Sequence, residues 1–373
     1  MSSTSRIRVM LLFGGRSGEH PISCATAAGV MRAIDQKRFE VLPVGITKDG
    51  RWVEVDPDPA TWEIKDGKLP EVVPASAGEV TLSLDVGSSE ARVVTDNEPV
   101  RSLGHIDVVF PLLHGPFGED GTVQGLLELA DIRYVGPGVL ASAVGMDKHF
   151  MKVVLQGSGI PVGPYEFFTA DQWDRDSAAI TKRVERLAYP LFVKPARAGS
   201  SLGITRISEP SQLADAVAEA RRHDARILVE QGIEGREIEC AVLQGRAGAP
   251  TRASLPGEIM VSHAEHTFYD FEAKYLDESS VTLSCPADLP SDVVARVQRL
   301  AIDTFEALAC EGLSRVDVFV TPTGDVIVNE INTMPGFTPF SMYPVMWQAS
   351  GMPYEELVDE LLALALERPL GLR

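Results

Sequence analysis

Short apolar runs, each followed by a glycine-containing loop, recur in the first third of the chain. Residues 7–13 and 106–113 are apolar runs, each with one charged residue near its start, as in strands buried on both faces of a parallel sheet. Small and apolar residues at helical spacing follow over 22–34 and 122–130, and residues 134–138 indicate a closing strand and turn. Strand, glycine loop and helix in this order predict a doubly wound α/β domain, whose ligands bind at the carboxyl ends of the strands.

The remaining two thirds also mix strand and helix patterns. Apolar runs predict strands over 191–195, 227–230, 238–243 and 258–261, and amphipathic spacing predicts helices over 141–155, 211–222, 289–308 and 354–366. Residues 263–290 show little periodicity but are charged and aromatic. Long loops of this kind are usually lids or binding loops, and the alternative is a disordered surface loop. Four aromatic side chains favour the lid: Phe268, Tyr269, Phe271 and Tyr275.

Residues 313–332 read as a β-hairpin whose turn is the segment Thr-Pro-Thr-Gly-Asp. A turn centred on the Thr-Gly step places Asp317 opposite Glu330, and Arg315 opposite Asn332. All four side chains then share one face, because side chains along a strand repeat every two residues. Strict alternation along the second strand also predicts Val326 and Val328 on one face, with Ile327, Asn329 and Ile331 on the other.

Two carboxylates that face each other across a sheet repel, unless a cation lies between them. Carboxylate and amide oxygens are the ligands that Mg²⁺ prefers, together with phosphate oxygens of a nucleotide. The alternative is a solvated outer face of the hairpin. The Gly-Phe-Thr-Pro-Phe-Ser run that follows, rich in small groups and backbone N–H donors, favours a site.

Composition argues against several classes of function. The formal net charge of −19 argues against nucleic acid and anionic membranes as partners, since these need basic surface. The four cysteines lie far apart without CxxC spacing, which indicates reduced thiols and neither a zinc site nor disulfides. No apolar stretch approaches the ~20 residues of a membrane span. We therefore expect a cytoplasmic protein.

Three loops after predicted strands contain candidate site residues. Glu19, in the loop 14–20, could hold a substrate cation or simply occupy the first turn of a helix. His114 follows a buried strand, where a histidine can bind substrate or be structural. Lys194 opens the glycine–serine loop 196–203. Successive N–H groups there could cradle a phosphate, with the lysine as its counter-charge, although a plain hairpin turn also fits.

Residues 230–237 look like a connection between two sheets. The acidic end of a strand, with exposed backbone, could bind the edge of an adenine, and Glu237 could hold a ribose. This segment and the loop 196–203 together suggest a nucleotide site.

Taken together, these segments resemble the D-alanine–D-alanine ligases of the ATP-grasp superfamily, over residues 14–341. The motifs that carry the resemblance stand in the family's order: Gly14-Gly15-Arg16-Ser17-Gly18-Glu19, Leu113-His114-Gly115 with Gly118-Glu119-Asp120-Gly121, Met146-Asp147-Lys148, Val193-Lys194-Pro195, Gly199-Ser200-Ser201, residues 230–237, Glu272-Ala273-Lys274-Tyr275, Arg315-Val316-Asp317, and Asn329-Glu330-Ile331-Asn332-Thr333 with Pro335-Gly336.

The resemblance implies an α/β, three-domain ATP-grasp ligase, with an N-terminal Rossmann-like domain before a two-part ATP-grasp. The implied boundaries are 1–137, 138–229 and 230–373, with a lid over about 263–286. The implied reaction joins two D-alanine molecules through a D-alanyl phosphate and releases ADP and phosphate. The implied cofactors are ATP and two Mg²⁺ ions, with Mn²⁺ as a substitute. The product would serve peptidoglycan precursor synthesis, and the protein would be a homodimer.

The resemblance also implies a role for each matching residue. The metal ligands would be Asp317, Glu330 and Asn332. ATP would be bound by Lys148, Lys194, Ser201, Glu230, Ile233, Glu237 and Lys274. Among the catalytic residues, Glu19 would bind the ammonium group of the first D-alanine. Arg315 and the N–H of Gly336 would form the oxyanion hole. Ser200 and Tyr275 would belong to a hydrogen-bonded network that closes the lid. Substrate would also contact His114, Ser341 and Met342.

Three alternatives remain open. A D-alanine–D-lactate ligase would share the fold and the first half-reaction, but relatives of that type usually lack the Glu-Ala-Lys-Tyr pattern that ends at Tyr275. Another ATP-grasp ligase could join different amino acids. A nucleotide-sensing or scaffold protein that has lost catalysis would be expected to lose Arg315 or a member of the metal set, and here all are present.

Overall fold

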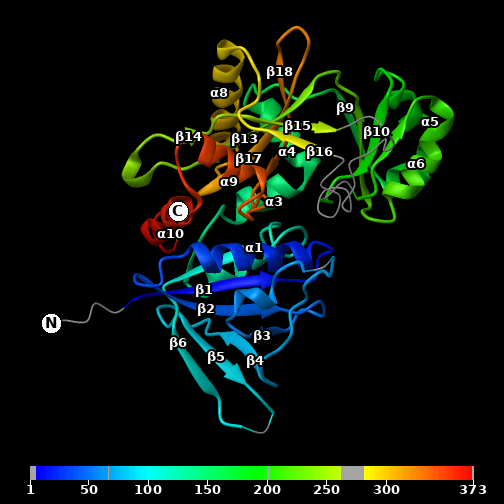
Figure 1. Cartoon of the computed structure of the whole chain (residues 1–373). Coiled ribbons are helices and arrows are strands. Elements are labelled where there is room, and N and C mark those ends of the chain that lie inside the picture. The colour runs from blue at the N-terminus through cyan, green and yellow to red at the C-terminus, as the bar shows by residue number, and fades with distance from the viewer. Residues whose placement is uncertain (1–5, 66, 97, 200–201, 262–280, 372–373) are drawn as a thin grey trace.

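The computed structural model describes residues 6–65, 67–96, 98–199, 202–261 and 281–371. In Figure 1, the N-terminal part of the chain forms one layer of sheet and helices, and the C-terminal two thirds form two further sheets beside it. Helix α1 (His20–Ala33) lies on the side of the N-terminal sheet that faces the rest of the molecule.

The N-terminal sheet has the predicted doubly wound character. Its strands lie in the order β3-β2-β1-β7-β8, and all neighbours are parallel except β2 and β3. The bounds are β1 (Ile7–Gly14), β2 (Phe39–Ile46), β3 (Trp52–Glu54), β7 (Val108–Leu112) and β8 (Arg133–Tyr134), with α2 (Thr122–Leu129) after β7. The predicted strands at 7–13 and 106–113 and the helices that follow them are confirmed.

Glycine is required where β1 ends. Gly14 has φ of +90°, and a methyl group on it would lie 2.4 Å from the carbonyl oxygen of Ile46. A larger residue would therefore push β2 away and disturb the loop that carries Glu19. A short 3-10 turn (Pro59–Thr61) and a small antiparallel sheet complete this part: β4 (Glu79–Leu82), β5 (Glu90–Val94) and β6 (Arg101–His105).

The helix predicted over 141–155 is wrong as a single helix. The structure has α3 (Val139–Met146) and α4 (Lys148–Gly157), separated at Asp147, whose ψ of 101° is not helical. The Asp147 carboxylate accepts hydrogen bonds from the N–H groups of His149 and Phe150, both at 3.1 Å, and so caps α4. The break places Lys148 at the first position of a new helix.

The central part is a four-stranded antiparallel sheet in the order β11-β10-β12-β9. Its strands are β9 (Tyr165–Thr169), β10 (Leu191–Pro195), β11 (Thr205–Ile207) and β12 (Arg226–Gln231), and α5 (Ala170–Val184), a 3-10 turn (Pro210–Gln212) and α6 (Leu213–Ala220) accompany it. Strand β12 belongs to this sheet and the next strand, β13, to the following one. The predicted connection between two sheets at 230–237 is confirmed.

The C-terminal sheet runs β16-β15-β13-β17-β18, with β14 paired to β13. The bounds are β13 (Arg236–Leu243), β14 (Arg252–Ala253), β15 (Gly257–Val261), β16 (Val281–Ser284), β17 (Leu313–Val320) and β18 (Val326–Asn332), with a 3-10 turn at Arg246–Gly248. Helix α8 (Ser291–Ala307) packs on it, and α9 (Met342–Ala349) and α10 (Tyr354–Glu367) follow. Part of the predicted lid is wrong, because β16 is a strand paired with β15; residues 262–280 lie outside the described residues.

The predicted pairing of the β17–β18 hairpin is confirmed for its four polar residues and is wrong nearer the turn. Asp317 lies opposite Glu330, and Arg315 opposite Asn332. Nearer the turn the register shifts, so that Val318 pairs with Val328 and Asn329 is the extra residue of a β-bulge. The bulge reverses the alternation, so Val328 and Ile331 both enter one core cluster. The prediction that these two residues lie on opposite faces is therefore wrong.

Other sequence expectations have mixed outcomes. All four cysteines are free thiols, as predicted. Within the described ranges, no helix has the length and apolar character needed to cross a bilayer. The boundaries 1–137, 138–229 and 230–373 stay a prediction.

Candidate active site

The paired strands β17 and β18 bring four polar side chains to one face. Arg315 donates to both carboxylate oxygens of Asp317, from Nε at 2.7 Å and from Nη2 at 2.6 Å. Asn332 donates to Asp317 from Nδ2 at 3.0 Å. Glu330, opposite Asp317, is about one third exposed and lies 3.4 Å from Nζ of Lys148. The two carboxylates are therefore balanced by two cations, as mutual repulsion requires.

Arg315 is held by a second acid that sequence reasoning missed. Glu239 lies opposite Asp317 on β13, and its Oε1 is 3.2 Å from Nη2 of Arg315. Burial by itself would lower the pKa of Arg315, but Asp317 and Glu239 raise that pKa well above its usual value. The guanidinium is thus a fixed charge. The available signal was the alternation Glu237-Ile238-Glu239, which puts two acids on one face of a strand.

Lys148 joins the hairpin to the loop after β10. Its backbone N–H donates to the carbonyl oxygen of Ala196 at 3.0 Å, and its Nζ donates to that of Ala198 at 2.9 Å. The same Nζ faces Glu330 on β18. A lysine predicted to bind phosphate therefore lies between the glycine–serine loop and the acidic face of the hairpin.

Glu230 lies between two lysines in the central sheet. Nζ of Lys152, on α4, is 2.9 Å from its Oε1, and Lys194, on β10, forms an ion pair with its Oε2. Burial alone would raise the pKa of Glu230, but the two lysines outweigh it and lower that pKa to about 2. Lys152 was not among the predicted site residues; its position one helical turn after Lys148 was the signal that could have found it.

The carboxylate of Glu19 lies where three loops meet. A methyl group on Gly115, after β7, would lie 2.7 Å from Oε2 of Glu19, and one on Gly199, after β10, would lie 3.3 Å away. Both positions are glycines, so the carboxylate fits closely against two backbones. The structure therefore brings the first predicted loop next to the glycine–serine loop of the central sheet.

His114 and Glu119 form hydrogen bonds that connect the N-terminal part to the loop after β18. Nδ1 of His114 lies 3.0 Å from the carbonyl oxygen of Met334, and Oε2 of Glu119 accepts from the Met334 N–H at 3.3 Å. Oε1 of Glu119 also accepts from the Gly115 N–H at 2.7 Å. His114 is buried and Glu119 is half-buried, and neither the contact nor a role for Glu119 was predicted.

Burial favours the neutral forms of the His114 ring and the Glu119 carboxyl group. Burial lowers the pKa of His114, which keeps its ring neutral near pH 7. Burial and the nearby charge of Glu19 raise the pKa of Glu119 to about 8. A neutral pair at this junction limits the negative charge gathered around Glu19.

The loop after β18 leads to three predicted site residues: Gly336 of the oxyanion hole, and Ser341 and Met342 at the substrate. A methyl group on Gly336 would lie 3.2 Å from Oγ of Ser341, so the two are neighbours. Ser341 is the N-cap position of α9 and its Oγ accepts from the Thr338 N–H at 3.1 Å. The Met342 side chain is buried in the core. Any contact of Met342 with a substrate carboxylate would therefore come from its backbone N–H.

The remaining predicted residues are less informative. Ile233 lies between β12 and β13, against Gly163, and Glu237 is exposed on β13 opposite Phe319. The other four lie outside the described residues: Ser200, Ser201, Lys274 and Tyr275. The roles predicted for all these residues stay predictions.

The residues present fit a magnesium site. The side chains of Asp317, Glu330 and Asn332 share one face of paired strands. Asn332 now directs its Nδ2 at Asp317, and a flip of this amide would present its oxygen, so that all three residues offer oxygen ligands. Mg²⁺ prefers such ligands and leaves positions for phosphate oxygens. Lys148 and Arg315, already at these carboxylates, show that the face favours positive charge.

Comparison with known proteins identifies the family. Residues 8–137 match the family model described as "D-ala D-ala ligase N-terminus", and residues 154–363 match the one described as "D-ala D-ala ligase C-terminus". The chain belongs to the D-alanine–D-alanine ligase family. The recognition made from its motifs is confirmed.

Members of this family resemble the chain over its whole length. The D-alanine–D-alanine ligase of Arthrobacter sp. (strain FB24) is 60% identical over 98% of this chain and 96% of its own length. That of Kineococcus radiotolerans is 58% identical, with both chains fully covered.

Two solved structures extend the comparison to the fold. The D-alanine–D-alanine ligase of Coxiella burnetii has a TM-score of 0.78 at 37% identity, covering 97% of this chain and 94% of that one. The VanG D-Ala:D-Ser ligase of Enterococcus faecalis has a TM-score of 0.82 at 34% identity, covering 97% and 100%. The expected α/β ATP-grasp fold with several domains is confirmed, as is the expected class of enzyme, an ATP-dependent ligase of this family.

Proposed function

We propose that this chain joins two D-alanine molecules into D-alanyl-D-alanine through a D-alanyl phosphate, with release of ADP and phosphate. The observation that carries the proposal is that Glu19, held against Gly115 and Gly199, lies at the loop after β10. Lys148 binds Ala198 of the same loop and faces Glu330 on the β17–β18 hairpin. An ammonium-binding carboxylate beside a set of phosphate- and metal-binding groups suits a ligase that activates an amino acid carboxylate.

The nucleotide would occupy the region between the central and C-terminal sheets. Lys148 and Lys194 supply positive charge for its phosphates, and the fixed ion pairs of Glu230 keep Lys194 in place. Two Mg²⁺ ions, held by Asp317, Glu330 and Asn332, would supply further charge against the phosphate oxygens. Catalysis of phosphoryl transfer depends mainly on such positioning and charge stabilisation.

The first D-alanine would bind with its ammonium at Glu19. Its carboxylate oxygen attacks the γ-phosphorus of ATP, forming a carbon–oxygen–phosphorus link and expelling ADP. The amine of the second D-alanine then attacks the acyl carbon, and phosphate leaves. The attack leaves a negative charge on the former carbonyl oxygen. Two donors would stabilise it: the Arg315 guanidinium, held in place by Asp317 and Glu239, and the N–H of Gly336. Preorganised donors have their largest effect where charge develops.

Three further parts of the proposal rest on the family resemblance. We expect a homodimer, a cytoplasmic location, and use of the dipeptide in peptidoglycan precursor synthesis. The mass of the purified protein in solution by light scattering tests the first. A monomer at the protein concentration of the cell would contradict it.

The proposed reaction is tested by phosphate release from ATP and Mg²⁺, with products identified by mass. The purified protein is given D-alanine, L-alanine, D-alanine with D-lactate, or D-alanine with D-serine. We expect release that requires D-alanine and yields D-alanyl-D-alanine. A depsipeptide or a mixed D-alanyl-D-serine product would assign a different second substrate, as in the D-Ala:D-Ser ligase to which the chain is similar. No release dependent on D-alanine would contradict the proposal.

A further inference from the structure

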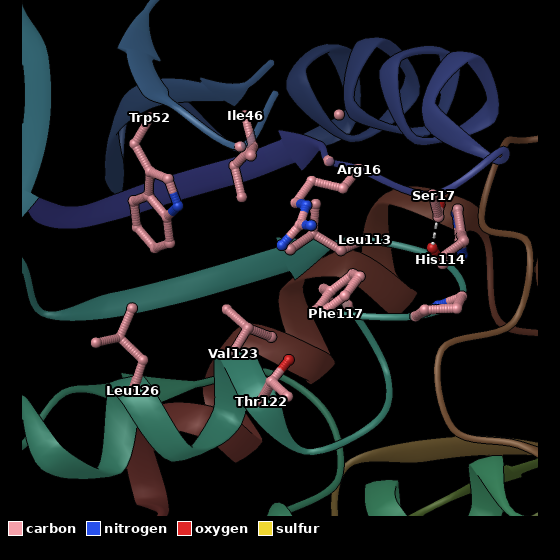
Figure 2. A pocket seen from close by; sticks show the side chains of 15 residues that line it. Arg16, Ser17, Ile46, Trp52, Leu113, His114, Phe117, Thr122, Val123 and Leu126 are labelled. Atoms are coloured by element: carbon pink, nitrogen blue, oxygen red, sulfur yellow. Dashed lines mark hydrogen bonds between the residues drawn. The ribbon is translucent and has the colours of Figure 1, made fainter. Parts of the chain in front are cut away.

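A cavity of about 200 Å³ lies beside the loop that carries Glu19 (Figure 2). The loops after β1 and β7, the ends of β2 and β3, and helix α2 line it. The cavity shares Ser17 and His114 with the loops of the candidate active site, but Glu19 is not part of its lining. Its apolar wall consists of Ile46, Trp52, Leu113, Val123 and Leu126.

Arg16 is the one arginine, lysine or acid among the lining residues. Its Cζ lies 4.3 Å from the centre of the Phe117 ring, and across the described ranges no carboxylate forms an ion pair with it. Figure 2 shows its guanidinium beside Leu113, facing the space between β1 and α2. A cation at the mouth of an apolar cavity is suited to an anion with an apolar body.

Two acids next to lining residues, Asp120 and Asp49, are already engaged. The Asp120 carboxylate accepts from the N–H groups of Phe117 and Thr122 at 2.8 and 3.0 Å. Asp49 accepts from Nε of Arg51 at 2.9 Å. These bonds hold both carboxylates at their own loops, so Arg16 is left to interact with an anion from solution.

Phe117 is held in an unusual backbone conformation. Its φ is +69°, which few residues other than glycine adopt, and its side chain is 47% exposed. The bond from its N–H to Asp120 maintains this conformation. The ring is thereby fixed against the Arg16 guanidinium, which orders a side chain that would otherwise move freely in water.

We propose that this cavity binds a small monocarboxylate with a branched or aromatic apolar body, its carboxylate at Arg16. The ligand carries no ammonium group, because no acid lines the cavity to receive one. It is smaller than a drug-sized ligand, since sites for those usually measure about 300–1,000 Å³. The net charge of −19 repels anions in general, so binding depends on this local cation.

The test is isothermal titration of 4-methylpentanoate into the full-length protein, with saturating D-alanine present throughout. We expect saturable binding at one site per chain. 4-Methylpentanamide and leucine are the matched ligands, since one lacks the negative charge and the other adds an ammonium; both should bind at least tenfold more weakly. Arg16→Gln should weaken 4-methylpentanoate at least tenfold, and Leu126→Trp, which fills the cavity, should abolish its binding.

Arg222→Gln is the matched control, because Arg222 is an exposed arginine that does not line the cavity. It should leave binding of 4-methylpentanoate unchanged. Equal binding to Arg16→Gln or to Leu126→Trp would overturn the proposal. So would the absence of 4-methylpentanoate binding to the unaltered protein.

Discussion

Asp317 and Glu330 lie directly opposite each other on adjacent antiparallel strands, and each faces a cation, Arg315 and Lys148 respectively. Such a pair of acids would destabilise a sheet unless positive charge compensated it. The arrangement therefore favours function over simple solvation of a hairpin, and it yields the first prediction.

Glu330→Gln should reduce ligation at least about 100-fold, the scale for losing one preorganised charge at a reacting centre. The change keeps the shape and removes the charge that would hold Mg²⁺. The measurement is phosphate release at saturating ATP and D-alanine, together with the unfolding midpoint. Asp325→Asn, an exposed acid in the turn of the same hairpin, is the control and should stay close to the unaltered rate. Near-normal activity of Glu330→Gln would remove the metal assignment.

Arg315 should not be replaceable by lysine. It makes two parallel bonds to Asp317 and faces Glu239, and the single ammonium of a lysine cannot reproduce that fork. We expect Arg315→Lys to lower kcat by about 100-fold and Arg315→Ala to abolish ligation. Steady-state kinetics check the first and product analysis by mass the second. A lysine variant with unaltered kcat would show that charge alone is needed and that the proposed oxyanion geometry is wrong.

Lys152→Met should make the protein sensitive to acid. Glu230 has a folded pKa of about 2 against a usual value near 4.5, so its stabilising effect is complete above pH 4.5 and is lost as the pH falls toward 2. Without Lys152 the folded pKa rises, and acid unfolding should begin at higher pH. Circular dichroism against pH measures this, with the exposed Lys182→Met as control. Superimposable curves for the two variants would contradict the role given to Lys152.

Glu119→Gln should flatten the pH dependence of stability between about pH 4.5 and 8. The folded pKa of Glu119 is about 8, above its usual value, so the folded state binds the extra proton in this window. The free energy of unfolding attributable to this group therefore falls as pH rises from 4.5 to 8, and glutamine removes that slope. Unfolding midpoints at several pH values, compared between the two proteins, check it. An identical slope in both would mean that Glu119 is already ionised in the folded protein.

Much of this architecture follows from local pattern. The strand–loop–helix units, the Asp317–Glu330 register and the connection at 230–237 depend on alternation and turn position, which neighbouring residues determine. The bulge at Asn329 and the break at Asp147 were not predicted, because each interrupts a regular repeat: one strand has an extra residue, and the Asp147 carboxylate caps a new helix. In both places the irregularity aims a charged side chain, Glu330 or Lys148, at the site.

The site was harder to predict than the strands. Glu239, Lys152 and Glu119 act through partners more than 75 residues away in sequence, on other strands or loops. A single sequence shows that such residues exist but not which distant groups they meet. The Arg16 cavity is a further example, because its wall comes from separate strands and a helix that approach only in the fold.

The most direct test of the central claim follows one oxygen atom. D-Alanine labelled with ¹⁸O in both carboxylate oxygens is supplied with ATP and Mg²⁺, and the released phosphate is examined by mass. If the carboxylate is activated as D-alanyl phosphate, each phosphate released during dipeptide formation carries one ¹⁸O atom. Phosphate without ¹⁸O, formed in step with dipeptide, would contradict the account, because the carboxylate would then never have been joined to phosphorus.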